Sequence, residues 1–259
     1  MDITQVLILV IVSFSASCLS FYSGFGLGTL LLPVFAIWFP VDQAVLMTAL
    51  VHFANNIFKW LLTRKNMDPL IIVRFGMPAI AGAILGALIL NLLKDNSTVY
   101  HWYFIGKTRA IYPIKLIIGG LILTFGIMEF VEFGSKVWSL KSMTIGGLLS
   151  GFFGGLSGHQ GALRSAFLLR YDLTKEVFIA TGIAIACLVD TARIIVYLPQ
   201  LLSGEINANA GIISLAMSGA FGGAWIGNQY LKKVKIKWIK IITTIGVILI
   251  GIAIAIGLI

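Results

Sequence analysis

Three basic side chains of this sequence lie deep inside apolar stretches, where a charge needs a partner or a ligand: Lys59, Arg164 and Arg193. The rest of the 19 Lys and Arg residues lie in or beside polar connectors. In hydrocarbon, a cation costs from about 3 to more than 10 kcal/mol. Arg164 falls in the first predicted helical turn after a glycine-rich break, so its guanidinium and the free N–H groups of that turn would face one point and suit an oxyanion. Lys59 and Arg193 either belong to the same site or extend to the membrane surface.

The break before Arg164 carries other groups that could bind a ligand. A hydroxyl, an imidazole, an amide and unwound backbone follow one another there, in Ser157, Gly158, His159, Gln160 and Gly161. Unwound backbone inside a membrane is tolerated only beside protein or a wet cavity, so this segment predicts a binding loop. A second break offers hydroxyls and backbone without charge and is expected to complete the site, through Ser23, Gly24, Gly26 and Thr29.

One acidic side chain lies close to these cations in the sequence. Asp190 precedes Arg193 by three residues, which places both on one helical face and predicts an internal ion pair. The alternative role is a proton carrier, or a counter-charge that is released when an anion arrives. His52 and Asn56 lie four residues apart on another apolar stretch, where they either form interhelical hydrogen bonds or line a pathway.

The composition sets the environment of all these residues. Apolar residues make up 59% of the chain, the mean hydropathy is +1.00, and charged residues make up 11%, against about 25% in soluble domains. So much apolar surface excludes a soluble enzyme, a nucleic-acid-binding domain and a disordered chain. The net charge of +9 comes mainly from short connectors and indicates positive loops on the cytoplasmic side of a membrane. Cys18 and Cys187 lie in apolar runs, and the sequence predicts neither a metal site nor a cofactor.

Apolar runs near the length of about 20 residues that crosses a bilayer predict the helices that hold these groups. Such runs cover residues 3–22, 41–62, 70–93, 111–131, 177–198, 208–231 and 239–259. Two shorter pieces, 29–39 and 162–169, each follow a glycine-containing break and are too brief to cross alone. Glycine favours broken backbone, so we expect two interrupted helices that end in half-helices.

The two breaks belong to an internal repeat. A shift of 134 places Asn56 on Asp190 and Lys59 on Arg193. We therefore expect an all-α polytopic membrane protein of about eight hydrophobic segments, in two four-segment repeats that each begin with an interrupted helix. The repeats would cover residues 1–133 and 134–259. The positive-inside rule fits parallel and inverted halves alike, and the shortness of the half-helices favours the inverted arrangement.

The sequence around the two breaks resembles that of a known family. The first break leads into Leu31-Leu32-Pro33, and the second reads Gly154-Gly155-Leu156-Ser157-Gly158. Together with the eight-segment layout and the duplicated halves, these motifs resemble the sulfite exporter TauE/SafE family, also called the toluene sulfonate uptake permease family. The resemblance implies a multi-pass permease of the bacterial cytoplasmic (inner) membrane that moves sulfur-containing anions such as sulfite, sulfonates or sulfoacetate. The first break here reads Gly-Phe-Gly-Leu-Gly and the second carries His159 and Gln160, so no single substrate is assigned.

These features support three hypotheses. The first is a secondary transporter for small anions, in which one half moves against the other and Asp190 couples transport to protons. The second is a passive anion channel. The third is an intramembrane serine protease, because Gly155-Leu156-Ser157-Gly158 and His52-x-x-x-Asn56 resemble rhomboid motifs, although no histidine follows His159 and this residue would not easily turn back to the serine as its base.

The transporter hypothesis is the one that we favour, and it assigns no enzyme activity to the chain. Its partners are a small anionic substrate and the lipid bilayer, without nucleic acid. The direction of transport and a homodimer are left open.

Overall fold

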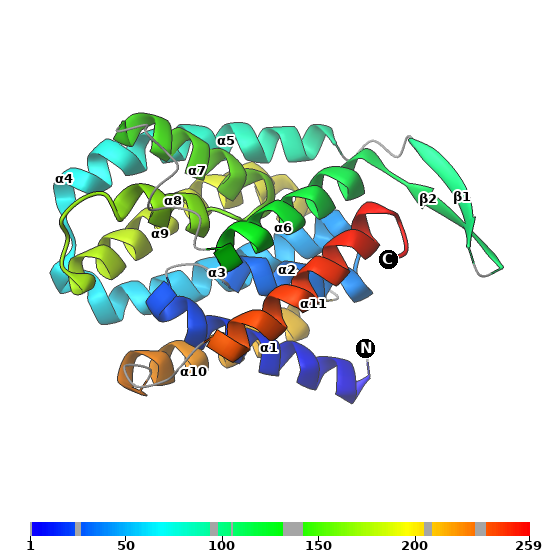
Figure 1. Cartoon of the computed structure of the whole chain (residues 1–259), viewed down its shortest axis with the longest axis horizontal. Helices are drawn as coiled ribbons and strands as arrows, with labels where there is room; N and C mark the ends of the chain where they lie inside the picture. Colours follow the sequence, from blue (N-terminus) through cyan, green and yellow to red (C-terminus); the bar gives the residue numbers. More distant parts are fainter. Residues whose placement is uncertain are drawn as a thin grey trace.

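The computed structural model describes residues 2–23, 27–93, 98–104, 106–131, 142–204, 209–230 and 237–259. Most of this chain is helical, and most helices run along one long axis (Figure 1). In chain order the elements are α1 (Ile3–Ser23), α2 (Leu27–Trp38), α3 (Val41–Thr63), η1 (Arg64–Asn66), α4 (Pro69–Ile71), η2 (Ile72–Gly76), α5 (Met77–Leu92), β1 (Tyr100–Phe104), β2 (Lys107–Ile111), α6 (Pro113–Val131), α7 (Met143–Ser157), α8 (Gly161–Leu168), α9 (Lys175–Leu202), α10 (Ala210–Tyr230) and α11 (Lys237–Ala255).

Five helical segments in the described part of the chain are long and apolar enough to cross a membrane. They are Ile3–Ser20, Val41–Asn66, Pro69–Leu92, Lys175–Leu202 and Ala210–Gln229. Shorter apolar helices accompany them, at Leu27–Trp38, Pro113–Met128, Met143–Ser157 and Thr244–Ala255. A helix satisfies all of its interior backbone polar groups within itself, which lipid requires. The expectation of a multi-pass, α-helical membrane protein is confirmed.

The second predicted interruption is present, and the first falls on residues 24–26, outside the described residues, between α1 and α2. α1 ends at Ser23 and α2 begins at Leu27, and α2 has only 12 residues. α7 ends at Ser157, and α8 begins at Gly161 and has only 8 residues. Gly158, which follows α7, has a φ of +84°, a left-handed conformation that ends the helix and suits glycine. Because a crossing needs about 20 residues, α2 and α8 are half-helices, as predicted.

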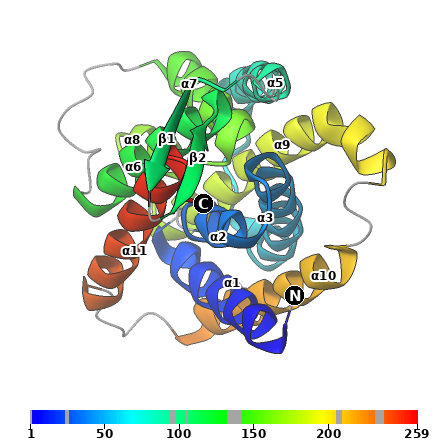
Figure 2. The same ribbon diagram turned by 90° about the vertical axis from the view of Figure 1, so that its right-hand side faces the viewer.

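One segment departs from the all-α expectation. Between α5 and α6 the chain forms an antiparallel hairpin of β1 and β2, with Tyr100 opposite Ile111 and Phe104 opposite Lys107. Aromatic and β-branched residues favour strands, and Gly106 has a φ of +73° in the turn. The hairpin protrudes from the bundle on the side where both chain termini lie (Figures 1 and 2). We call this side the hairpin end, and the opposite side, where α4 lies, the α4 end.

The long helices pack in pairs that join distant parts of the sequence. α5 packs along α7, α1 along α10 and α6 along α11, while α3 packs against α9. Glycines allow the closest approaches: a Cβ at Gly151 would overlap the backbone of Ala79 on α5, and a Cβ at Gly223 would overlap that of Phe14 on α1. Small residues of this kind let helices approach closely in lipid. We call these contacts the α5–α7 seam and the α1–α10 seam.

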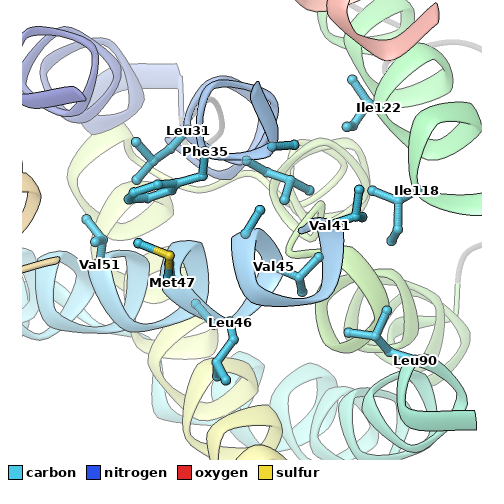
Figure 3. Close-up of a cluster of buried hydrophobic side chains, with 14 of the residues drawn as sticks. Leu31, Phe35, Val41, Val45, Leu46, Met47, Val51, Leu90, Ile118 and Ile122 are labelled. Atoms are coloured by element: carbon cyan, nitrogen blue, oxygen red, sulfur yellow. The ribbon is translucent and has the colours of Figure 1, made fainter. Parts of the chain in front are cut away.

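A hydrophobic core fills the hairpin-end half of the bundle. It joins α2, the first half of α3 and the ends of α5 and α6 that lie nearest the hairpin (Figure 3). Its fully buried side chains include Leu31, Phe35, Met47 and Ile118. This apolar core lies between the hairpin end and the polar groups that gather around the two interruptions.

Replacing Gly151 by alanine is expected to destabilise the protein. The added Cβ would meet backbone atoms of α5, which move aside only if the α5–α7 seam opens, and overpacking of this kind costs about 1–3 kcal/mol. The midpoint of thermal unfolding in detergent measures the effect. Gly120→Ala on α6 is the matched control, because a Cβ there meets no atom within 4 Å. Equal midpoints for the two variants would contradict this account of the seam.

Candidate functional site

The two interruptions meet beside a small polar cavity. A Cβ at Gly28, near the start of α2, would lie 2.9 Å from the carbonyl oxygen of Gly158, which follows α7. The cavity that both residues line has a volume of about 40 Å³. One water molecule needs about 10–15 Å³ of such space, so a few waters or one small oxyanion fit inside. Residues of α1, α2, α3, α6, α8 and α9 form its wall.

Two buried basic side chains line this cavity. Lys59 is 3% exposed and donates from Nζ to Ser20 Oγ at 2.7 Å. Arg164 is 5% exposed and donates from Nη1 to Gln160 Oε1 at 3.2 Å. A Cβ at Gly182 would lie 3.4 Å from Arg164 Nε, so glycine leaves room for the guanidinium. Lys59 is therefore held inside the bundle, and the alternative that it extends to the membrane surface is wrong.

The first turn of α8 also lines the cavity. Gly161 and Ala162 are cavity residues at the start of that helix, and Arg164 lies in the same turn. The backbone N–H groups of a first turn point outward along the axis and carry partial positive charge. Such helix N-termini bind anions. The wall thus combines two basic side chains with a helix dipole, and a small anion is the ligand that it favours.

Behind this wall lies a fully buried carboxylate with four partners. Arg193 Nη2 lies 2.8 Å from Asp190 Oδ1, and both side chains are 0% exposed. Gln160 Nε2 donates to Oδ1 at 3.1 Å, while Asn56 Nδ2 and His52 Nδ1 each lie 2.7 Å from Oδ2. The predicted ion pair is confirmed. A carboxylate surrounded by a cation and three hydrogen-bonding groups has little space for a proton, so the arrangement favours a structural role for Asp190.

Arg193 also closes the end of α7. Its Nη1 donates to Gly154 O at 3.3 Å, and the hydroxyl of Tyr197 donates to Gly155 O. These carbonyls belong to the last turn of α7, where the helix dipole is negative. A Cβ at Gly158 would lie 2.9 Å from Arg193 Nη1. Glycine is therefore required there for two reasons, the positive φ of the backbone and the space that the guanidinium occupies. Extension of Arg193 to the membrane surface is therefore wrong as well.

His159 connects the break to the cavity wall. Its Nδ1 lies 2.9 Å from Ser157 Oγ, so the ring does turn back to the serine, contrary to the sequence-based expectation. The hydroxyl of Ser157 donates to Phe153 O at 3.1 Å, whereas a serine activated for attack would donate to the imidazole. The ring stacks on Phe125 with centroids 5.4 Å apart. Its Nε2 has no hydrogen-bond partner among the residues that the structure describes.

Comparison with known families shows which family the chain belongs to. The family model of the sulfite exporter TauE/SafE matches residues 9–254, nearly the whole chain. The chain belongs to the TauE/SafE family. This membership, together with the long apolar helices, makes it a multi-pass membrane protein of a transporter family for sulfite-like anions.

A curated protein is also similar to this TauE/SafE chain, the undecaprenyl-diphosphatase of Borrelia recurrentis (strain A1). The two are 23% identical over 154 residues, which is 54% of this chain and 58% of that protein. The chain therefore spans less than two thirds of the relative's length, and so distant a match assigns no hydrolytic activity to it. No solved structure matches the chain significantly.

The cavity of the TauE/SafE chain brings together residues that the sequence predicted separately. Those that line it are Thr29, His52, Asn56, Lys59, Gly158, His159, Gly161 and Arg164. Others stand behind the wall and contact it, namely Ser157, Gln160, Asp190 and Arg193. Ser23 is the last residue of α1, and Gly24 and Gly26 lie outside the described residues. That these residues bind an anion stays a prediction.

Sequence reasoning missed Ser20 and Phe125, which also line the cavity. Ser20 carried a signal, because the shift of 134 that relates Lys59 to Arg193 also relates Ser20 to Gly154, the partner of Arg193. Phe125 carried none. In an apolar helix, the sequence alone does not distinguish an aromatic residue that contacts a functional residue from one that only packs in the core.

Removing the cation from the buried ion pair is expected to destabilise the protein strongly. Arg193→Met leaves Asp190 charged and buried, and breaking a buried pair in this way costs about 3–5 kcal/mol. Arg193→Met combined with Asp190→Asn removes both charges and should recover part of the loss. Thermal unfolding midpoints of the wild type, both single variants and the double variant measure the coupling. A double variant no more stable than Arg193→Met alone would contradict it.

Proposed function

We propose that this TauE/SafE protein is a secondary transporter that carries a small sulfur-containing oxyanion through the cavity between its two interrupted helices. The observation that carries the proposal is the cavity wall, where Lys59, Arg164 and the first turn of α8 surround one small space. Charge at membrane depth needs compensation, and such residues mark substrate pathways. An oxyanion supplies both negative charge and several hydrogen-bond acceptors, which suits a guanidinium and a helix N-terminus.

The position of the cavity supports access from the α4 end. Its α3 residues, from His52 to Lys59, lie in the second half of that helix, and its α9 residues, 178–183, lie in the first half. The start of α9 meets the start of α4, where the backbone N–H of Asp68 donates to Thr181 Oγ1 at 2.9 Å. The larger apolar core, part of which Figure 3 shows, lies toward the hairpin end, and a smaller cluster around Ile71, Phe75 and Phe167 packs beside α4. The cavity therefore lies in the α4 half of the bundle, with the larger core between it and the hairpin end.

Basic connectors favour the cytoplasm at the α4 end. Arg64 and Lys65 follow α3 there, Arg170 lies between α8 and α9, and Lys175 is the first residue of α9. Positively charged connectors stay on the cytoplasmic side of a membrane. A cavity on this side would load its anion from the cytoplasm. This orientation and the exporter description of the family together favour export as the direction of transport.

We also propose that the two predicted halves are inverted repeats. Lys59 donates to Ser20 in the last turns of α1, and Arg193 donates to Gly154 in the last turn of α7, and a shift of 134 relates the two contacts. The seams are reciprocal too, because α5 of the first half packs on α7 of the second, as α10 of the second packs on α1 of the first. Any two-fold axis would exchange contacts in this way. The axis would lie in the membrane plane because α3 runs toward the α4 end, whereas its counterpart α9 begins at that end and runs away from it.

Replacing Arg164 by alanine is expected to abolish stabilisation by anions while the protein still folds. Purified protein in detergent is heated with sulfite, thiosulfate, sulfate or methanesulfonate, because a ligand at 100 times its Kd stabilises the folded state by about 2.7 kcal/mol. Arg74→Ala removes an exposed arginine that does not line the cavity and should respond like the wild type. An Arg164→Ala variant that kept the full response would refute the site.

Counterflow distinguishes a carrier from a passive channel. Proteoliposomes loaded with unlabelled sulfite should transiently accumulate labelled sulfite above its equilibrium level, because an alternating-access site exchanges one anion for another on each return. A channel lets both anions run down their gradients independently. Uptake that never exceeds equilibrium would therefore favour the channel.

A further inference from the structure

We infer that His159 makes the site select an oxyanion that still carries one proton, such as hydrogen sulfite, over sulfonates and fully deprotonated anions. The inference rests on the proposed function, since it concerns the same cavity. His159 is 3% exposed and lines the cavity, and its Nε2 has no hydrogen-bond partner in the part of the chain that the structure describes. Buried polar atoms are nearly always hydrogen-bonded, so an unpaired one beside a cavity points to a ligand.

The contacts of the ring assign its hydrogen to Nδ1. Ser157 donates its only hydroxyl hydrogen to Phe153 O, at 3.1 Å, and Nδ1 of His159 lies 2.9 Å from the same hydroxyl oxygen. That oxygen can only accept from the ring, so Nδ1 carries the hydrogen and Nε2 of the neutral imidazole is an acceptor. Because Ser157 occupies Nδ1, Nε2 is the ring nitrogen that is left to bond a molecule in the cavity that His159 lines.

The charged groups around the ring are Lys59 on α3, Arg164 on α8, and the Asp190–Arg193 pair on α9. The titratable ring of His52 on α3 also lines the cavity and contacts Asp190. The two members of the Asp190–Arg193 pair offset each other, which leaves positive charge on the cavity side. A proton added to the imidazole would place one more cation beside Lys59 and Arg164, and Coulomb repulsion opposes this. The cavity therefore presents a neutral acceptor among cations.

A ligand that bonds all the polar groups of the cavity wall needs both a negative charge and a hydroxyl group. Deprotonated oxygens would accept from Arg164 and Lys59, and one S–OH group would donate to His159 Nε2. Hydrogen sulfite with its proton on oxygen carries both groups, whereas methanesulfonate and the sulfate dianion lack the O–H. A site built to hydrogen-bond a hydroxyl discriminates strongly against an analogue without it, because its own polar group is then left unpaired. A carrier of hydrogen sulfite moves one proton with each sulfite, and no side chain needs to titrate.

The test compares anions on the full-length protein and two variants. Dissociation constants for sulfite and methanesulfonate are measured from thermal stabilisation on the acidic and alkaline sides of neutrality. The wild type should bind sulfite more tightly on the acidic side, where hydrogen sulfite predominates, and methanesulfonate equally on both. His159→Phe should weaken acidic-side sulfite binding about tenfold and leave methanesulfonate unchanged, the effect of one hydrogen bond to a charged ligand. His159→Gln, whose amide oxygen also accepts, should keep most of the sulfite affinity.

His101→Phe is the matched control, because it removes a histidine from the exposed hairpin. It should behave like the wild type. Two results would overturn the inference without contradicting the anion site. The first is an equal loss of affinity for sulfite and methanesulfonate in His159→Phe, and the second is a wild-type affinity for sulfite that does not change with pH. If no anion stabilises the wild type, both the proposed function and this inference are wrong. Should His159→Phe not fold, His159→Gln and the wild-type pH profile decide the question.

Discussion

The buried carboxylate of Asp190 holds together three parts of the molecule that are far apart in the sequence. Its ion pair fixes Arg193, which closes α7, and its hydrogen bonds fix Asn56 on α3 and Gln160 in the second break. Gln160 in turn accepts a hydrogen bond from Arg164. Asp190 therefore also helps to position the guanidinium of Arg164 beside the cavity, through Gln160. A buried charge that loses its partner is strongly destabilising, so the position of the cavity residues depends on this network.

This network divides the buried cations into two groups with different tasks. Arg193 is committed to a carboxylate and to the end of a helix, and it does not line the cavity. Lys59 and Arg164 both line the cavity, as do Gly28 and Gly158 from the two breaks. One deep arginine is thus paired with a buried carboxylate, whereas Lys59 and Arg164 line a space of ligand size. The first arrangement favours rigidity, and the second suits the anion site that we propose.

The sequence predicted the features that would cost free energy in a membrane if they had no function. Charges at membrane depth and glycines within apolar runs are expensive unless used, so Lys59, Arg164 and the two breaks stood out. Packing was less predictable. The left-handed turn at Gly158 brings His159 back to Ser157, a reversal that residue spacing does not reveal. The hairpin was missed because hydropathy reports burial in lipid and not the pairing of strands outside it.

The two glycine seams have a mechanical consequence. Each joins a helix of one half to a helix of the other by direct backbone contact, as at Gly151 and Gly223. Interfaces packed this closely transmit displacement and do not absorb it. Two helices from different halves would therefore move together as one rigid body. In the transport cycle that we propose, the moving bodies would then differ from the halves that we expect to repeat along the chain.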